Sequence, residues 1–366
     1  MAQTKKIGAP DLIHLEAGKC SFAELAQPVY SAHSKRFVVA GVIKKWLRFR
    51  MLSAHGTSRA KAQVVKTTRN KDSTMFSVTF WGVRGSIATP GADTAKVGGN
   101  TSCVEVQCGT RRIVLDTGTG MRQLGQRLLG QKKAAAQPEP TDLTVFYSHL
   151  HWDHLQGLPF FAPIYSPTTK LHFYGPKGVE RALRTQMGDP GFPVRIDDVP
   201  ARISFGELGE GMVVSLADDL IISCARLNHP GGVLAYRIQY QDHALVYATD
   251  TEHYSVPDPK LVRLARDADL LIYDAQYDDA EYSGETSGVP RTGWGHSTFR
   301  EGIRVADAAR VGQLVLFHHD PSHSDDQVAH IEATAQRIRP GTLAAREGHT
   351  IAIAAAEEKP ALAVAA

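Results

Sequence analysis

The chain has 366 residues, 43% of them hydrophobic and 22% charged, with a net charge of +3, which is typical of a globular protein and not of a disordered one. No run of about 18 apolar residues or more occurs, and the N-terminus lacks the apolar core of a secretory signal, so we predict no membrane span and a cytoplasmic location. Four cysteines in so long a chain exclude a disulfide framework and match no CxxC zinc pattern.

Residues 1–74 differ in charge from the rest of the chain. They contain 14 Lys+Arg against 4 Asp+Glu, which leaves 27 Lys+Arg against 34 Asp+Glu, a net of −7, for residues 75–366. We interpret residues 1–74 as a basic extension that is either disordered or misassigned, since Met75 could itself start translation. The alternative is a basic arm that contacts an anionic partner through an amphipathic helix. The acidic remainder argues against a broad nucleic-acid surface, so we expect no extended nucleic-acid partner.

From Met75 onward, segments with strand patterns alternate with helical ones. The hydrophobic and β-branched pattern predicts strands over 75–83, 103–109, 111–118, 143–149, 170–176, 220–229, 234–240, 244–250, 269–276 and 313–320. Helices are predicted over 120–130, ending at Gly130, over 257–268, 297–312 and 324–339, with a further helix starting in 155–161. Many strands with interspersed helices predict an α/β domain of sheets covered by helices.

Five of the predicted strands end on or next to a histidine or aspartate: Asp116, His149, His229, Asp250 and His318. Strand ends that share one edge of a sheet converge on one cleft. The densest stretch is SHLHWDHLQGL, residues 148–158, which contains four residues with metal-binding side chains: His149, His151, Asp153 and His154. Imidazole and carboxylate groups suit Zn²⁺, Mn²⁺ or Fe²⁺. A single histidine at a strand end is usually structural, whereas this density predicts a metal site.

The order H-x-H-x-D-H, then an isolated histidine, an aspartate and a final histidine, resembles the metallo-β-lactamase superfamily over roughly residues 76–353. The resemblance implies an αββα sandwich for residues 75–366, with two divalent metal ions, Zn²⁺ first and Mn²⁺ or Fe²⁺ as alternatives. It implies that His149, His151 and His229 bind one ion, that Asp153, His154 and His318 bind the other, that Asp250 bridges them, and that Asp116 supports the site by hydrogen bonding.

The sequence GHST at 295–298 resembles the phosphodiesterase branch of this superfamily, which includes tRNase Z and phosphoribosyl cyclic phosphate phosphodiesterase. The resemblance implies that His296 protonates the leaving group; the alternative is that His296 caps the helix that follows. His229 and Asp250 are only 21 positions apart, which leaves no room for the arm with which bacterial tRNA-processing enzymes grip tRNA. The cysteine cluster of the cyclic phosphate enzyme is also missing, so the match is to the branch and not to one enzyme.

We therefore expect a hydrolase that cleaves a small or cyclic phosphodiester, such as a cyclic nucleotide or a ribose cyclic phosphate, with His296 and Asp153 as catalytic residues. The alternatives are a thioesterase, a lactonase, a tRNA 3′-end endonuclease, or a non-catalytic metal-binding module. A homodimer is a candidate assembly because dimers are frequent in this branch.

Several residues near the motifs have two interpretations each. Arg84 and Asn100 either meet an anionic substrate or stabilise turns. Asp274 either faces the cleft or caps the chain that follows, and His323 either contacts substrate or is solvated. The tryptophans at 81, 152 and 294 either line a ring-sized pocket or pack in the core.

Overall fold

The computed structural model describes residues 75–134 and 140–354. The basic segment 1–74 lies outside these residues, so its interpretation as a separate extension stays a prediction. Within the described part of the chain, no helix combines the length and apolarity needed to cross a bilayer.

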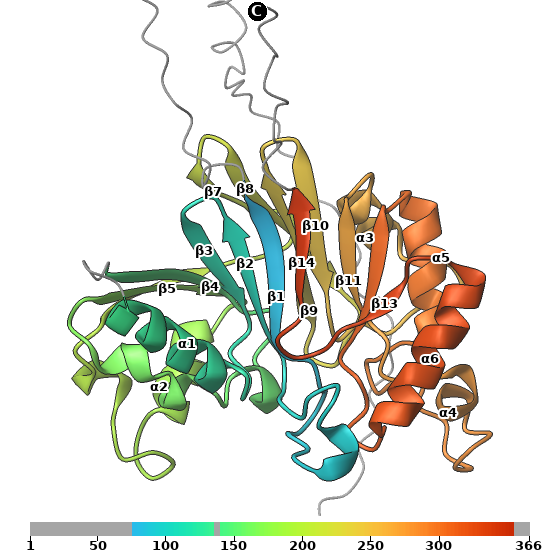
Figure 1. Ribbon diagram of the computed structural model, residues 1–366, viewed down its shortest axis with the longest axis horizontal. Helices are drawn as coiled ribbons and strands as arrows, with labels where there is room; N and C mark the ends of the chain where they lie inside the picture. Colours follow the sequence, from blue (N-terminus) through green and yellow to red (C-terminus); the bar gives the residue numbers. More distant parts are fainter. Residues whose placement is uncertain (1–74, 135–139, 355–366) are drawn as a thin grey trace, which may run out of the picture. The chain divides into compact units, whose positions relative to one another are not determined.

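Two seven-stranded sheets form the centre of the described structure (Figure 1). The first has the order β14-β1-β2-β3-β4-β5-β6 and the second the order β13-β12-β11-β10-β9-β8-β7. The strands of the first sheet are β1 (Phe76–Gly82), β2 (Cys103–Cys108), β3 (Arg111–Leu115), β4 (Thr141–Phe146), β5 (Thr169–Gly175), β6 (Arg202–Glu207) and β14 (Thr350–Ala354). Those of the second are β7 (Val213–Ala217), β8 (Leu220–Leu227), β9 (Val233–Tyr240), β10 (His243–Ala248), β11 (Leu270–Asp274), β12 (Gln313–Phe317) and β13 (Leu343–Ala344).

Helices cover the outer face of each sheet. Residues of α1 (Met121–Ala134) and α2 (Val179–Gln186) share an apolar cluster with the first sheet, and residues of α3 (Pro259–Ala265), α5 (Phe299–Ala309) and α6 (Asp325–Ile338) share one with the second. A third cluster, which includes Phe76, Val78 and Phe80 of β1, lies between the sheets. Alternate residues of a strand face opposite sides, so each sheet contributes to two of these clusters. The four layers confirm the αββα sandwich that the sequence predicted.

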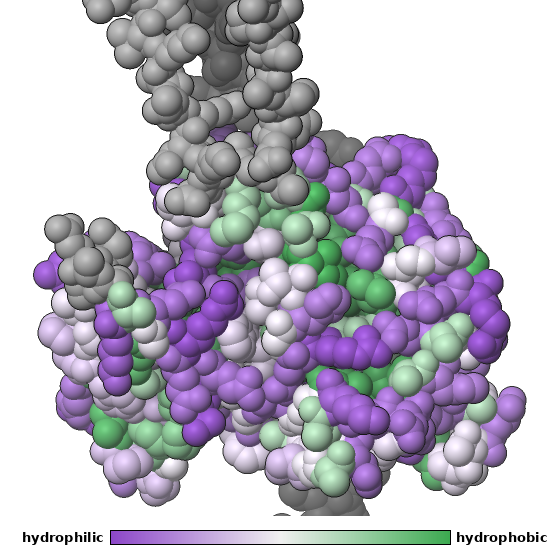
Figure 2. All heavy atoms as spheres, in the orientation of Figure 1, coloured by the Kyte–Doolittle hydropathy of each residue, from purple (hydrophilic) through white to green (hydrophobic). Residues whose placement is uncertain are grey.

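The surface agrees with this inward packing. Figure 2 shows a face that is mostly hydrophilic, with smaller apolar areas between the polar ones. Such a surface is expected when the apolar sides of helices and strands are turned toward the clusters beneath them.

Two helix predictions were wrong. Helix α1 continues through Gly130 to Ala134, because a glycine inside a helix costs only about 1 kcal/mol and does not end it. Residues 155–161 do not start a long helix: 155–157 form a turn after the short 3₁₀ helix η3 (Trp152–His154), and the chain continues with η4 (Leu158–Phe160) and η5 (Ala162–Tyr165). Pro159 and Pro163 lack the N–H groups that a continuous helix would use.

The parallel parts of the two sheets place several strand ends at one edge of the sandwich. Strands β3 to β6 are parallel to one another, as are β10 to β13. Just beyond β3, β10 and β12, the residues Asp116, Asp250 and His318 have φ angles of 59°, 51° and 61°. At each of these three positions the left-handed backbone turns the polypeptide sharply after a strand, at the same edge of the sandwich. The three side chains therefore lie in one cluster.

Candidate metal centre and active site

Seven side chains meet at this edge and are called here the His–Asp cluster: His149, His151, Asp153, His154, His229, Asp250 and His318. The first four come from the loop after β4, and the others follow β8, β10 and β12. The structure thus brings together all the residues that the sequence suggested as ligands, from both sheets.

Three histidines form one side of the cluster. The ligand atoms of His149, His151 and His229 all lie within 4.8 Å of one another, and Nε2 of His229 is 3.0 Å from Nδ1 of His151. His229 donates its Nδ1 proton to the carbonyl oxygen of Gly295 at 2.8 Å. Because the Nδ1 proton is used there, Nε2 of His229 is left as a lone-pair donor toward the cluster.

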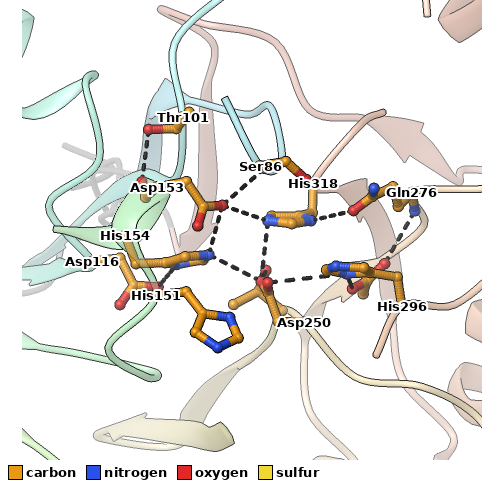
Figure 3. A network of polar contacts seen from close by, with 12 residues as sticks. Ser86, Thr101, Asp116, His151, Asp153, His154, Asp250, Gln276, His296 and His318 are labelled. Atoms are coloured by element: carbon orange, nitrogen blue, oxygen red, sulfur yellow. Dashed lines mark hydrogen bonds and ion pairs between the residues drawn. The ribbon is translucent and has the colours of Figure 1, made fainter. Parts of the chain in front are cut away.

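Four buried residues form the other side. Nε2 of His154 lies 3.2 Å from one carboxylate oxygen of Asp153 and 3.2 Å from Oδ1 of Asp250. Nε2 of His318 lies 3.4 Å and 3.2 Å from the same two oxygens (Figure 3). The second oxygen of Asp250 is 3.7 Å from Nε2 of His149. Asp250 therefore lies between the two groups of residues.

The donor set fits divalent cations. Among the described residues, Nε2 of His149 and Nε2 of His154 are buried and have no hydrogen-bond partner. Buried imidazole nitrogens without a hydrogen-bond partner, beside carboxylate oxygens, are arranged to hold positive charge. Imidazole with carboxylate is also the ligand combination that Zn²⁺ and similar ions prefer.

The electrostatics point the same way. Burial, with the neighbouring His154, holds the pKa of His149 well below its usual value. Burial opposes a charge on Asp250, but the histidines around it hold its pKa well below the usual range. Burial likewise opposes a charge on His154, yet Asp153, Asp250 and Asp116 outweigh burial and raise its pKa well above normal. The neutral form of His149 and the ionised carboxylates suit cation binding, and the raised pKa of His154 reflects an excess of negative charge that a bound cation would neutralise in place of the proton.

Asp116 lies behind the cluster and is completely buried. It accepts hydrogen bonds from the backbone N–H of Ser148 at 2.7 Å, the Ser148 hydroxyl at 2.7 Å, Nδ1 of His154 at 2.8 Å and the Tyr247 hydroxyl at 2.9 Å. These contacts fix the proton of His154 on Nδ1 and turn its Nε2 toward the cluster. Asp116 is thus placed where the resemblance implies a supporting residue.

His296 is next to the cluster but is bonded to a different carboxylate. Its Nδ1 donates to Asp274 at 2.8 Å, and the nearest carboxylate oxygen of Asp250 is 4.0 Å away. Asp274 is buried and also accepts from the backbone N–H groups of Thr251, Gln276 and Ser297 at 3.1–3.2 Å. Burial opposes a charge on His296, but Asp274 outweighs burial and raises the pKa of His296 to about 9.

Contacts bear on two of the open interpretations. The His296 side chain bonds Asp274 and not the first turn of α5, so it is not the cap of that helix. Asp274 meets both of its interpretations, since one oxygen accepts from His296 and the other accepts the N–H of Gln276, two residues further along the chain.

The contacts of the remaining residues that the sequence marked show which of them support the fold. Arg84 is fully buried and donates to the carbonyl oxygens of Gly98, Asp320 and His323. Asn100 and Trp81 donate to glutamates, and His323 is buried against Glu281. Trp152 and Trp294 do not pack in the core, since they are 67% and 50% exposed. Trp152 lines an open groove of ≈ 720 Å³.

Sequence reasoning missed several residues that orient the cluster. Gln276 accepts a hydrogen bond from Nδ1 of His318 at 3.0 Å. Glu252 accepts from the backbone N–H groups of Gly293 and Gly295 and so fixes the carbonyl that holds His229. No motif marks either residue; the one signal was that Gln276 is the last residue of a predicted strand and that Glu252 follows another predicted strand by two positions.

Comparisons with known proteins agree with this geometry. Residues 111–319 match the family model described as "Beta-lactamase superfamily domain". Ribonuclease Z of Brevibacillus brevis is 26% identical over 267 residues, which cover 57% of this chain and 79% of that protein. Ribonuclease Z of Natronomonas pharaonis is 26% identical over 308 residues, covering 68% and 88%.

Solved structures share the fold. A diphosphatase from the PhnP family superposes with a TM-score of 0.54 at 18% identity, covering 75% of this chain and 97% of that one. The short form of human tRNase Z superposes with a TM-score of 0.54 at 20% identity, covering 76% and 99%.

The expectation that no extended nucleic acid is a partner was wrong. The similar proteins are named ribonuclease Z, and one solved structure is a tRNase Z. The inference from net charge failed because the acidic total includes carboxylates that are buried in the site, such as Asp116, Asp153, Asp250 and Asp274. These groups do not contribute to the surface that a nucleic acid would meet.

Proposed function

Because this chain belongs to the metallo-β-lactamase superfamily, we propose that it is a metal-dependent phosphodiesterase whose substrate is RNA. The observation that carries the proposal is the Asp274–His296 pair beside the His–Asp cluster, with Nδ1 of His296 2.8 Å from Asp274. The alkoxide that departs from a phosphodiester leaves poorly unless it is protonated. A thioester needs such a proton donor less, because its leaving group is a thiolate.

The chain would hold two divalent ions. His149, His151 and His229 would bind one, Asp153, His154 and His318 the other, and Asp250 both. Such ions would supply a water of lowered pKa as the nucleophile and would neutralise charge on the phosphoryl oxygens. Asp116 and Gln276 orient His154 and His318 through their Nδ1 protons, so the ligand nitrogens are set before any ion arrives.

The catalytic roles follow from the remaining contacts. His296 keeps Nδ1 on Asp274, so Nε2 is the nitrogen that can give a proton to the leaving oxygen. Asp274 stabilises the imidazolium form and fixes the ring. Asp153, which also accepts the N–H of Ser86 at 2.9 Å, would orient the attacking water.

RNA as the substrate is supported by the relatives named ribonuclease Z. A second candidate is a small or cyclic phosphodiester, and one specific observation favours it. The 21 positions from His229 to Asp250 contain β9 and β10, with a two-residue turn between them. This interval therefore holds no long insertion that could grip an RNA, which is what a small substrate would need least.

A substrate panel with metal analysis tests the proposal. The purified chain is measured for bound metal and for hydrolysis of 3′-extended RNA, a 2′,3′-cyclic nucleotide, bis(p-nitrophenyl) phosphate, a thioester and a lactone. We expect about two ions per chain and turnover of the phosphodiesters, with RNA the best substrate. Turnover of the thioester alone would contradict the proposal.

The variant His296→Ala tests the proton donor. It should lower turnover of RNA more than that of bis(p-nitrophenyl) phosphate, whose leaving group needs no proton, while metal content is unchanged. His172→Ala is the matched control, since His172 is on β5 and bonds only surface groups of Ser204 and Asp142. Equal losses on both substrates, with metal retained, would remove His296 from this role.

A further inference from the structure

The loop between α4 (Asp279–Ser283) and α5 carries Arg291 and Trp294 at a fixed position beside the cluster. Glu252 accepts from the N–H groups of Gly293 at 2.7 Å and Gly295 at 2.9 Å. The carbonyl oxygen of Gly295 accepts from Nδ1 of His229 at 2.8 Å. Because the same loop both holds a cluster histidine and is held by Glu252, its side chains have a defined place relative to the reacting bond.

Arg291 is held between aromatic rings. Its guanidinium carbon is 4.4 Å from the centroid of the Trp294 ring and 5.9 Å from that of Tyr277. The Tyr277 ring is in turn 6.1 Å from the His296 imidazole. The Tyr277 ring thus lies near both the Arg291 guanidinium and the proposed proton donor, so Arg291 is close enough to contact a group of the substrate next to the reacting bond.

The positive charge of Arg291 is not neutralised by the protein. Within residues 75–134 and 140–354 no ion pair to Arg291 occurs, whereas Arg300, Arg304 and Arg310 each have a carboxylate oxygen at 2.7–2.9 Å. Nε of Arg291 is enclosed and has no hydrogen-bond partner among those residues. An enclosed donor without an acceptor is unfavourable unless a ligand supplies one.

We propose that Arg291, held by Trp294, binds the phosphate that neighbours the scissile phosphodiester in a single RNA strand. The inference rests on the proposed function and narrows it to substrates with a second phosphate. A guanidinium presents a planar set of donors that matches phosphate oxygens. Stacking on Trp294 fixes that plane in advance and lowers the entropy lost on binding.

The test compares substrates that differ by one phosphate. Among the RNA substrates, the dinucleotide ApA is compared with 5′-phosphorylated pApA and with the trinucleotide ApApA. The mononucleotide pair is the p-nitrophenyl ester of thymidine 5′-monophosphate with and without a 3′-phosphate. The wild-type chain should favour the strands with the extra phosphate by about 10- to 100-fold in kcat/KM, the effect of one hydrogen bond to a charged group. A preference confined to the mononucleotide pair would overturn RNA as the source of the phosphate.

Arg291→Ala should reduce this preference to about 1 and lower the slope of log kcat/KM against log salt by about one. Arg300→Ala is the matched control, because Arg300 also stacks on an aromatic ring, Phe299, at 5.3 Å but has Asp279 as its partner. It should keep both the preference and the slope. Arg291→Lys, which keeps the charge but not the plane, should keep an intermediate preference.

The outcomes separate the two proposals. If the wild-type chain hydrolyses phosphodiesters but shows no preference, or if Arg291→Ala keeps the preference, the subsite is overturned and the proposed function stands. If no phosphodiester is hydrolysed, both fall. If Arg291→Ala does not fold, as judged by circular dichroism and metal content, Arg291→Lys and Trp294→Ala decide: both must lower the preference relative to Arg300→Ala.

Discussion

Two buried carboxylates, Asp116 and Asp274, serve the site in the same way from opposite sheets. Asp116 follows β3 of the first sheet and Asp274 ends β11 of the second, and each accepts the Nδ1 proton of a histidine at 2.8 Å. Beyond His154 lie two further carboxylates at 3.2 Å, whereas the only other carboxylate within 4.0 Å of His296 among the described residues is Asp250, at 4.0 Å. In the proposed function, the surroundings of the histidine, and not the carboxylate that holds its Nδ1, thus distinguish the metal ligand His154 from the proton donor His296.

The largest effect that would test this comparison is expected for Asp274→Asn. An amide keeps the shape of the side chain but does not stabilise the imidazolium, so kcat on RNA should fall by about 10²- to 10⁴-fold. Metal content, measured by mass spectrometry, should stay at the wild-type level. Loss of metal would mean that Asp274 has the same role as Asp116.

The same variant should change the pH dependence in a defined direction. A general acid must be protonated, so the rate falls as pH rises through the pKa of His296. Asp274 raises that pKa to about 9 in the free chain, and bound cations lower it again by repulsion. Removing the charge of Asp274 lowers the pKa further, so the basic limb of the kcat profile should move to lower pH. An unchanged limb would argue against His296 as the acid.

Asp116→Asn should have the next largest effect, and on metal affinity. Substitution of a residue that bonds the far nitrogen of a metal-binding histidine weakens metal binding by about 10- to 100-fold. Titration with a chelator-buffered metal series measures the loss, and excess metal should restore most of the activity. The basic limb should stay at the wild-type pH, opposite to the result for Asp274→Asn.

Tyr247→Phe is a milder form of the same change. It removes one of the four donors to Asp116 and leaves the other three. The free energy of unfolding should fall by about 1 kcal/mol, and metal affinity should fall by less than in Asp116→Asn. A loss of metal as large as in Asp116→Asn would show that the tyrosine, and not the serine contacts, orients the carboxylate.

Glu332→Gln gives the smallest expected effect on the site and serves as a carboxylate that accepts no hydrogen bond from a histidine among the described residues. Glu332 accepts from the Ala344 N–H and from Arg346 at 2.5–3.0 Å. Burial opposes its charge, but Arg346 holds its pKa below the usual value. The wild-type chain should be more stable than the variant by about 1–2 kcal/mol near neutral pH.

The sign of its pH dependence follows from the depressed pKa. The folded state holds fewer protons than the unfolded state between the two pKa values, so the contribution of Glu332 is present above the unfolded pKa of about 4.3 and is lost as pH falls through the folded pKa. Chemical unfolding at a series of pH values should show the free energies of unfolding of the wild-type chain and of Glu332→Gln converging as the pH falls through the folded pKa. Activity and metal content should match those of the wild-type chain throughout.

The two halves of the site differ in how far the sequence predicts them. On the first sheet, His149 to His154 lie within one loop, so their density marks them, and the family resemblance marks Asp116, which follows β3. On the second sheet, Asp274 ends β11 and Gln276 follows it, but this strand resembles any buried strand. Only the parallel pairing of β10, β11 and β12 brings the two residues beside His296 and His318. Arg84 suggested an anion site, but its guanidinium ties three backbone carbonyls together inside the fold.

The left-handed backbone at Asp116, Asp250 and His318 has a consequence for how this protein can change. Each of these residues has a Cβ in a conformation that costs roughly 1–2 kcal/mol for most L-amino acids, and less for aspartate. Glycine would remove that cost, but at Asp116 it would also remove a carboxylate that accepts four hydrogen bonds, and buried donors left without an acceptor cost more than the strain. The side chain's own contacts therefore hold the strained backbone in place, and a search for stabilising substitutions should avoid Asp116 although its φ angle favours glycine.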